Sequence, residues 1–356
     1  MRRWVVIALV LHLSAFARAQ SGGTGVFSIL NQSADSRTMA WGSYMLAHPD
    51  SDPLLSACNP ALLRDKDVGV AALSYGHLFP TVLEGSAISQ AAAAYSWKWN
   101  KLADWNLGAQ MRYIDYGIMD AYDAGGNPTG TVSANESVFG LLASKALSPA
   151  SHWRFGIQSG VVYSVLGPYV SNGWYNHLGL YYNRPDSVLQ LGFTVRNLGT
   201  TLVSYRDVGK EPLPTQVHAA VTFKPIHMPF RFQFVLHDLQ RWDLTYDQYL
   251  DGGGKIDLNG NPIVAQPASA SEKALRHLSF GTELVTGPNG AVMLGYDHQR
   301  RMEMTSDIRR GTSGFSWGIR FKVSKFHLTY SSAAYFPSKN SNLLSLTINP
   351  ALFSKP

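Results

Sequence analysis

Cysteine is almost absent from this chain of 356 residues, which contains only Cys58. A single cysteine cannot form an internal disulfide, so a disulfide-stabilised secreted scaffold is excluded. A nucleophilic cysteine would need a histidine base or a cationic pocket nearby. Neither is offered by its sequence neighbours, Ser56, Ala57, Asn59 and Pro60. We therefore interpret Cys58 as a small buried residue.

Charged residues are also scarce, at 15% of the chain, and the formal net charge is +6. Arg2, Arg3 and Arg18 contribute to that charge and lie in residues 1–19, which we expect to be removed. The remaining positive excess is small and scattered along the sequence. This distribution argues against a nucleic-acid-binding protein.

Long apolar runs are absent beyond residue 19. Residues 1–19 themselves have the pattern of a signal peptide, with a basic start, an apolar core at 4–13 and small residues near 17–19. Cys58 does not follow this cleavage point, so we do not expect a lipid anchor. No later run is long enough for a transmembrane helix. We expect an exported β protein, either secreted or inserted in the bacterial outer membrane.

Sequence motifs of enzymes are missing as well. There is no Ser-His-Asp signature, phosphate-binding loop or spaced Cys/His ligand motif. We therefore predict no catalytic residue, no cofactor and no enzymatic activity. Oxygen-rich turns at 123–128, 251–254 and 257–261 suggest calcium ligands, but their spacing does not match an EF-hand loop. We interpret them as surface turns.

What the sequence does contain is alternation with a period of two, the pattern of β-strands. Apolar residues take every second position over most of 153–163, with glycine or polar residues between them. The same pattern recurs at 188–196, 230–237 and 314–323. Fourteen segments fit it: 68–76, 90–99, 105–114, 138–145, 153–163, 176–183, 188–196, 215–223, 230–237, 277–284, 290–297, 314–323, 326–334 and 342–348.

Long and short connections alternate between these segments. The long 115–137 is followed by the short 146–152, and the long 238–276 by the short 285–289. Outer-membrane barrels have this asymmetry, with long external loops and short periplasmic turns. We therefore predict an all-β fold, a 14-stranded antiparallel transmembrane β-barrel formed by residues 68–356, with both termini in the periplasm.

The two faces of the predicted strands suggest different surroundings. We expect aromatic residues at strand ends to form interfacial girdles; they are Trp97, Trp99, Trp105, Tyr113, Trp153, Tyr163 and Tyr330. Arginines on the polar faces would be costly in a dry core, so we expect them to be solvated charges in a water-filled lumen. They are Arg112, Arg154, Arg196, Arg231 and Arg320.

Residues 20–67 precede the first predicted strand. A 14-stranded barrel encloses more space than its wall side chains fill, so we predict that this segment is a plug. Asp52 as N-cap, with Pro53 at the first helical position, starts a short turn, and the Asn59-Pro60 step ends it. The predicted plug residues are Leu54, Leu55, Cys58, Asn59 and Pro60.

A cluster of histidines and charges is predicted at the outer ends of the ninth to eleventh strands. It contains His237, Asp238, His277, Asp297 and His298, with Arg241, Asp243, Arg300 and Arg301 just beyond. Three interpretations remain open: a metal site, a charge-paired rim that orders the 238–276 loop, or a docking surface for a protein partner, with Trp242 and Tyr246 as anchors. We favour the charge-paired rim over the metal site.

An ordered series of short motifs resembles the PorQ family, outer-membrane components of the type IX secretion system that are distantly related to FadL-type fatty-acid transporters. The likeness runs from about Gly25 to the last predicted strand. The motifs are Tyr113–Gly117, Gly125–Thr131, Arg196–Gly199, Glu211–Pro214, Pro229–Arg231, His237–Leu244, Leu275–His277, Gly295–Arg301 and Gly314–Ser316.

The resemblance implies a non-enzymatic role in a cell-surface attachment complex. PorQ-like proteins hold the peripheral protein PorZ beside PorU and PorV, and PorU processes exported cargo and joins it to anionic lipopolysaccharide. The expected partners are therefore PorZ, PorU and PorV, together with outer-membrane lipid and lipopolysaccharide. FadL-like barrels also carry an N-terminal plug, often with an Asn-Pro-Ala step such as 59–61.

Two other functions remain open. A FadL-type transporter of hydrophobic compounds would need a continuous apolar path, which the glycine-rich and polar inner faces disfavour. A soluble secreted β-sandwich adhesin would not be retained in the membrane.

Overall fold

The structure, a computed structural model, describes most of the chain. The described residues are 26–50, 52–83, 86–99, 104–148, 150–205, 210–245, 268–287, 289–304, 311–335 and 340–349. The predicted signal peptide at 1–19, the anchor residue Tyr246 and the oxygen-rich turns between 251 and 261 lie outside these residues.

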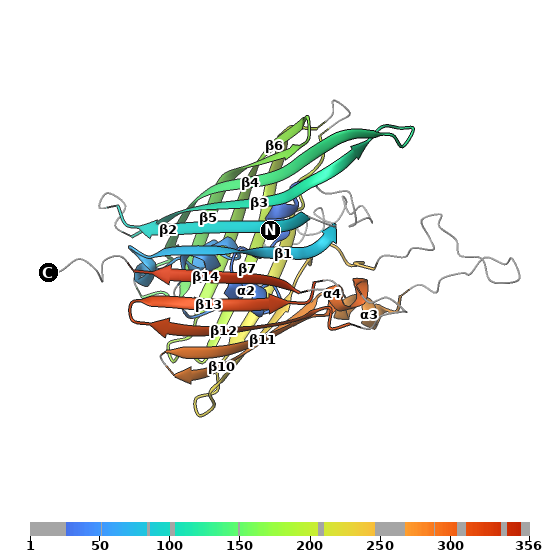
Figure 1. Ribbon diagram of the computed structural model, residues 1–356. Coiled ribbons are helices and arrows are strands. Elements are labelled where there is room, and N and C mark those ends of the chain that lie inside the picture. Colours follow the sequence, from blue (N-terminus) through green and yellow to red (C-terminus); the bar gives the residue numbers. More distant parts are fainter. Residues whose placement is uncertain are drawn as a thin grey trace, which may run out of the picture.

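The chain forms a closed antiparallel barrel of fourteen strands, each paired with its neighbours in sequence (Figure 1). The barrel closes where the first and last strands pair, with Ala71 opposite Ile348. Closure pairs every strand with a neighbour on each side, although β3, β4 and β7 extend past one neighbour at one of their ends. The strands are β1 Ala71–Leu83, β2 Ser86–Trp97, β3 Asn106–Tyr122, β4 Pro128–Ala146, β5 Trp153–Leu166, β6 Tyr169–Asn183, β7 Leu189–Val203, β8 Gln216–Phe223, β9 Phe230–Leu236, β10 Leu278–Gly287, β11 Gly290–Asp297, β12 Phe315–Val323, β13 Phe326–Ala333 and β14 Ser341–Ile348. The predicted fold class is confirmed.

Several strands are longer than predicted, and the long connection expected at 115–137 is mostly strand. β3 and β4 continue outward as a hairpin to the turn at 123–127 (Figure 1). The Asp123 carboxylate closes this turn by accepting hydrogen bonds from the backbone N–H groups of Gly125 and Asn127, both at 2.9 Å. The prediction was wrong here because the hairpin extension is exposed or half-buried on both faces, so apolar alternation is not required.

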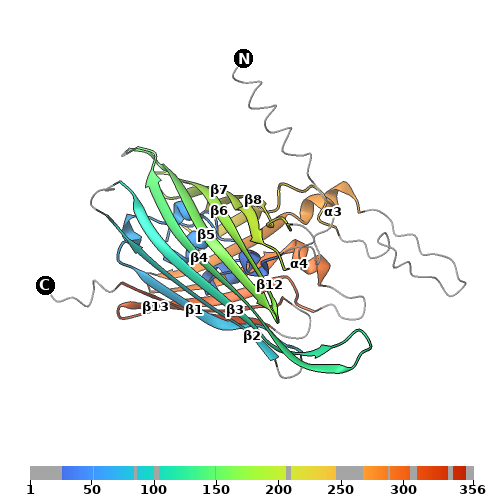
Figure 2. The same ribbon diagram turned by 90° about the horizontal axis from the view of Figure 1, so that it is seen from above.

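The two ends of the barrel differ. One end carries the short β6–β7, β8–β9 and β12–β13 turns, and we call it the turn end. The opposite end carries the β3–β4 hairpin and two short helices, α3 Ala270–Leu275 and α4 His298–Glu303, and we call it the loop end (Figures 1 and 2).

The outward face of the strands is apolar and uncovered. In β4, Phe139 and Leu141 point outward and are 48% and 54% exposed, whereas Val138 and Leu142 point inward and are buried. Exposed apolar side chains recur around the barrel, including Leu73, Val161, Leu294, Phe321 and Leu344. An apolar surface of this extent needs a hydrocarbon environment or a partner to cover it.

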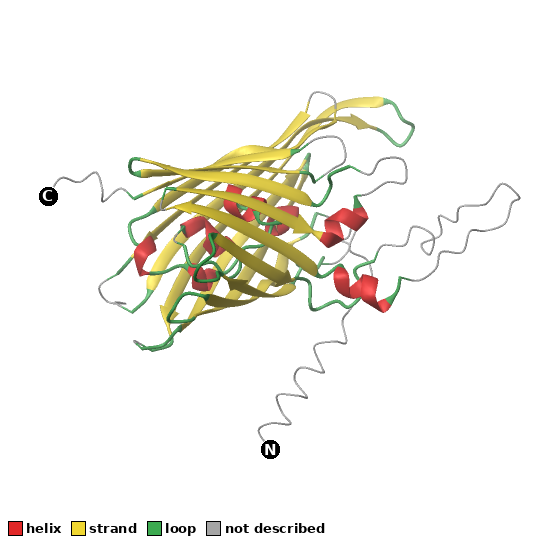
Figure 3. Cartoon of the chain, turned by 90° about the horizontal axis from the view of Figure 1, so that it is seen from below, coloured by secondary structure: helices red, strands yellow, loops and turns green. Residues whose placement is uncertain are grey.

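The N-terminal segment, residues 26–50 and 52–70, lies inside the barrel (Figure 3). It contains η2 Ser28–Asn31, α2 Ser36–Ala40, η3 Pro53–Ala57, η4 Pro60–Leu62 and η5 Asp65–Asp67. Its apolar side chains form the hydrophobic core together with inward strand residues: Phe27, Ile29, Leu30 and Met39 pack in one cluster, and Trp41, Met45, Leu46, Leu55 and Leu62 in a second. None of the helices in the described part of the chain is long and apolar enough to cross a membrane.

Candidate functional site

The predicted plug residues lie in the lumen, enclosed by the barrel wall. Leu54, Leu55 and Asn59 have no exposed surface, Cys58 is 4% exposed, and Pro60 is buried. The Cys58 thiol donates a hydrogen bond to Thr38 Oγ1 at 3.7 Å, and burial raises the pKa of this thiol. A reactive thiol requires a lowered pKa. Cys58 therefore contributes to the packing of the segment and is not a reactive group.

Two polar side chains fix the turns of this segment. The Asp52 carboxylate accepts a hydrogen bond from the Leu54 N–H at 3.0 Å, with Pro53 following it at the first helical position. Asn59 has the same capping role for η4, where its side-chain oxygen accepts from the Ala61 N–H at 3.0 Å. A cap of this kind satisfies a backbone donor that the short helix leaves unpaired.

Asn59 also ties the segment to itself and to the barrel wall. Its side-chain amide donates to the Leu46 carbonyl at 2.8 Å and to the Leu180 carbonyl of β6 at 3.0 Å. One buried residue therefore joins two parts of the segment to a wall strand. Replacing it would leave the buried Leu46 carbonyl and the partly buried Leu180 carbonyl without this partner, which is costly for a buried group.

Wall glycines allow the segment to approach the strands closely. A Cβ atom at Gly156 of β5 would overlap with the backbone of Pro60 and Ala61. A Cβ atom at Gly179 of β6 would overlap with the Asn59 side chain. A glycine within a strand often marks such an approach of another backbone. The glycine-rich inner face is therefore the contact surface of the segment.

The wall arginines Arg112 and Arg196 face inward, but they are not solvated. Arg112 donates to the Gln32 carbonyl at 2.6 Å, and Arg196 donates to the Leu30 carbonyl at 2.9 Å. Both arginines are almost fully buried, at 3% and 5% exposed. Around these two arginines the expectation of a water-filled lumen was wrong, since a charged group can be buried where polar partners replace water. The partners are backbone carbonyls of the N-terminal segment.

A cluster of buried charges joins the segment to β9, β10 and β12. The Asp50 carboxylate is 2.6 Å from Arg320 Nη1 and 3.0 Å from Arg37 Nη2. Glu283 forms an ion pair with Arg231, and its second carboxylate oxygen is 3.5 Å from Arg320 Nη2. These five residues, together with His48, are called the Asp50–Glu283 cluster below.

Metal ions are commonly bound by three or more His, Cys, Asp or Glu side chains. Among the described residues, one group of three such side chains has its ligand atoms within 4.8 Å of one another, and it consists of His48, Asp50 and Glu283. Burial lowers the pKa of His48 to about 3 against the opposing charge of Asp50, so its ring is neutral. However, the guanidinium groups of the cluster already compensate both carboxylates, and they would repel a cation. The chemistry of this group fits an ionic contact between plug and wall, and does not fit a metal site.

At the loop end, the structure brings the predicted rim residues into separate contacts. His237 Nδ1 is 2.9 Å from Asp238 Oδ2, and His277 Nδ1 is 2.7 Å from the His237 carbonyl. Asp297 caps α4 by accepting from the Arg300 N–H at 2.9 Å. Within the described residues, these side chains do not converge as three metal ligands.

Other rim residues contact the plug or one another. The Arg300 guanidinium lies 4.1 Å from the centre of the Tyr335 ring and donates to Ser43 Oγ at 3.1 Å. Arg301 donates to the Gly311 and Ser313 carbonyls, and His298 Nδ1 is 2.9 Å from the Tyr296 hydroxyl. Arg241 is half-buried, whereas Trp242 is 62% exposed.

Burial opposes ionisation of Asp238, but hydrogen bonds from His237 and Gln240 more than offset it and hold the pKa of Asp238 well below its usual range. Asp238 is therefore a charged, hydrogen-bonded part of the rim at neutral pH. The loop end thus combines an ordered polar base with exposed apolar side chains, which are Leu239, Trp242, Leu275 and Met302.

The Asp50–Glu283 cluster was not identified from the sequence. Arg231 and Arg320 were assigned to the wall, but Arg37, His48, Asp50 and Glu283 were given no role. One signal was available, because Glu283 shares the inward face of its strand with Gly281. A carboxylate on that face needs a buried cation partner.

No family model and no curated protein matches the sequence. Among solved structures, the P. putida toluene transporter TodX is 12% identical with a TM-score of 0.51, and the alignment covers 90% of this chain and 99% of TodX. The CymD monoaromatic hydrocarbon channel is also 12% identical with a TM-score of 0.51, covering 88% of this chain and 96% of CymD. At these identities the likeness concerns the fold, which is that of FadL-like 14-stranded barrels.

Proposed function

We propose that this chain is an integral outer-membrane protein of the type IX secretion attachment complex, with the non-enzymatic role of the PorQ family. Its barrel holds PorZ at the cell surface beside PorU and PorV. The observation that carries this proposal is the filled lumen: the N-terminal segment is bound on several sides by wall residues. A plug of this kind also occurs in FadL-like transporters, so the proposal relies in addition on the exposed apolar side chains at the loop end, of which Trp242 is 62% exposed.

A location in the outer membrane follows from the surface of the barrel. Closed barrels and helices are the structures that satisfy every backbone group within a bilayer. The outward face is uncovered and apolar along the strands, as the lipid-facing band of such barrels is. The exposed aromatic residues Trp153 and Tyr163 lie on this face, at 41% and 44% exposed.

The surface proposed to bind PorZ is the rim surface, defined as residues 237–245 with helices α3 and α4. It offers exposed apolar anchors, of which Trp242 is the most exposed. Ion pairs surround these anchors, such as Arg276 with Glu272 at 2.9 Å. Binding surfaces commonly combine a few aromatic or apolar anchors with a polar surround.

The test replaces Trp242 and Met302 with alanine in cells that make the full complex. We expect PorZ at the cell surface to fall about tenfold, because anchor residues commonly contribute 2 kcal/mol or more to binding. The readout is surface labelling of PorZ, together with heat-dependent gel mobility of the barrel. Tyr122→Ala is the matched control, since Tyr122 is also 62% exposed at the loop end but lies on the β3–β4 hairpin.

The second candidate is a channel for hydrophobic compounds, and the shared fold with the toluene transporter and the hydrocarbon channel favours it. The polar contacts between wall and plug weigh against it. Unchanged PorZ retention in the double variant, combined with barrel-dependent uptake of toluene by whole cells, would replace the attachment role with this one.

A further inference from the structure

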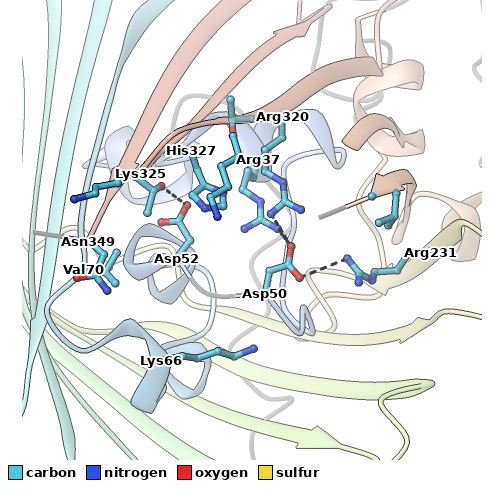
Figure 4. Close-up of a pocket in the computed structure, with 15 residues that line it drawn as sticks. Arg37, Asp50, Asp52, Lys66, Val70, Arg231, Arg320, Lys325, His327 and Asn349 are labelled. Carbon is cyan, nitrogen blue, oxygen red and sulfur yellow. Dashed lines mark hydrogen bonds and ion pairs between the residues drawn. The ribbon is translucent and has the colours of Figure 1, made fainter. Parts of the chain in front are cut away.

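A cavity of about 500 Å³ lies between the N-terminal segment and the wall, towards the turn end (Figure 4). The segment contributes Arg37, Asp50, Asp52 and Lys66 to its lining, and β9, β10 and β12–β14 contribute the other side. Lys66 and Lys322 are exposed, so the cavity can be reached from solvent. This volume falls within the usual range for small-molecule sites.

The lining of this cavity is strongly basic. Its carboxylates are Asp50 and Asp52, and its lysines and arginines outnumber them: Arg37, Lys66, Arg231, Arg320, Lys322 and Lys325. Asp50 is already shared among arginines of the Asp50–Glu283 cluster. Asp52 is occupied by the Leu54 N–H and by the Thr347 hydroxyl, each at 3.0 Å. Glu283, behind the lining, also pairs with Arg231 and Arg320. Three carboxylates therefore face six cationic groups, and the positive charge of the cavity is only partly compensated by the protein.

The arrangement of the cationic groups also favours binding of an anion over a role as ordinary solvated surface charges. The guanidinium groups of Arg37 and Arg320 are held by Asp50, so binding an anion would require little reorganisation of them. Both Arg37 and Arg231 line the cavity and carry a buried Nε without a hydrogen-bond partner among the described residues. Lys322 lies beside the β12–β13 turn and is exposed, so its ammonium group can move to contact a bound ligand.

We propose that this cavity binds a phosphate-bearing ligand at the turn end of the barrel. Arginine and lysine are the side chains that bind phosphate oxygens best, by charge-assisted hydrogen bonds. The hydroxyl of Thr329, which also lines the cavity, adds a neutral donor. The phosphate could be carried by a soluble compound or by a lipid headgroup, and both present the same chemistry to these residues.

The experiment measures binding to the purified, folded protein in a neutral detergent by isothermal titration calorimetry. The probes are pyrophosphate and dihexanoyl phosphatidic acid, with dihexanoyl phosphatidylcholine as the zwitterionic comparison. We expect saturable binding of at least one phosphate probe and none of phosphatidylcholine. Binding of phosphatidic acid about tenfold tighter than pyrophosphate would support a lipid source; comparable or weaker binding would support a soluble one.

The variant Lys322→Glu with Lys325→Glu is expected to weaken phosphate binding about tenfold or more, because it reverses two charges at the cavity. Lys224→Glu is the matched control: Lys224 follows β8 at the turn end but does not line the cavity, and its effect should stay within about twofold. Gel mobility in urea confirms that each variant is folded. Absence of saturable binding to either phosphate probe, or equal weakening by Lys224→Glu, would overturn the proposal and leave the cations as contacts of the plug alone.

Discussion

The N-terminal segment is held in two different ways on two sides of the lumen. Towards β5 and β6, helix η4 lies against Gly156 and Gly179, and the wall has no side chains at the points of closest approach. Towards β9, β10 and β12, Asp50 of the segment pairs with Arg320 and Arg231 of the wall, and His48 of the segment contacts Glu283. One side depends on shape, and the other depends on charge.

The two modes of contact respond differently to change. A backbone-to-backbone contact has no spare volume, so adding even one methyl group forces the segment or the strand to move. A buried ion pair tolerates small movements but is strongly destabilised when one partner loses its charge. The charged side is therefore where a change in protonation or an anionic ligand could loosen the segment, and the glycine side is where its position is fixed.

The charged side should show the largest effect. Glu283→Gln keeps the shape of the side chain but leaves Arg231 and Arg320 with less compensating charge. Breaking a buried pair in this way costs about 3–5 kcal/mol, so the urea midpoint of unfolding should fall markedly. Glu272→Gln is the control, because Glu272 pairs with Arg276 in a half-exposed position, where the cost is less than about 1 kcal/mol.

Cys58 provides a second measurement for the same variant. It is the only cysteine of the chain and is almost fully buried in the segment, so its rate of alkylation by a maleimide reports displacement of the segment. Glu283→Gln should raise this rate, whereas Glu272→Gln should not. Equal unfolding midpoints and equal alkylation rates for the two variants would show that the charge cluster does not hold the segment.

The glycine side should show the next largest effect. In Gly156→Ala the new methyl group would overlap with the backbone of Pro60 and Ala61, so we expect a loss of about 1–3 kcal/mol and faster alkylation of Cys58. Gly290→Ala is the matched control, since its Cβ would meet the Thr286 hydroxyl at 2.7 Å and the Arg320 carbonyl oxygen at 3.6 Å, neither of which belongs to the segment. If both variants were as stable as the wild type, the fit between η4 and the wall would be looser than the structure indicates.

The sequence predicted those strands in which apolar and polar residues alternate. The wall was predictable because strands with different surroundings on their two faces alternate, as 153–163 does. The outward extension of β3 and β4 was not, because residues 116–122 are exposed or half-buried on both faces and carry no such pattern. The outer ends of β3 and β4 are therefore set by pairing between the two strands, which the residue pattern does not reveal.

The contents of the lumen were harder to predict for a chemical reason. Arg112 and Arg196 were correctly placed on the inner face, but their partners are the carbonyls of Gln32 and Leu30. Every residue has a carbonyl, so no residue type marks the acceptor. The glycines did carry a signal, because glycine at inward positions such as Gly156 indicates a close backbone approach, and it was interpreted instead as part of a polar lumen.

The smallest of these effects concerns pH at the charged side. Burial and the nearby charge of Asp35 raise the pKa of Asp52 to about 6, against Arg37 and the hydrogen bonds from Leu54 and Thr347. A carboxyl group whose folded-state pKa is above its unfolded value stabilises the protein at low pH, and this contribution is lost as pH rises through about 6. Between pH 5 and pH 7.5 the wild type should therefore lose about 1 kcal/mol from this group.

Asp52→Asn isolates this contribution, because asparagine caps a helix as well as aspartate does but does not titrate. We expect unfolding of the variant in urea to lack the Asp52 part of the pH dependence, and the variant to gain stability relative to the wild type at pH 7.5. Measuring both proteins at each pH removes the contribution of the groups they share. Parallel stability curves for the two proteins between pH 5 and pH 7.5 would mean that Asp52 stays ionised in the folded state, with its negative charge compensated by the basic lining of the cavity.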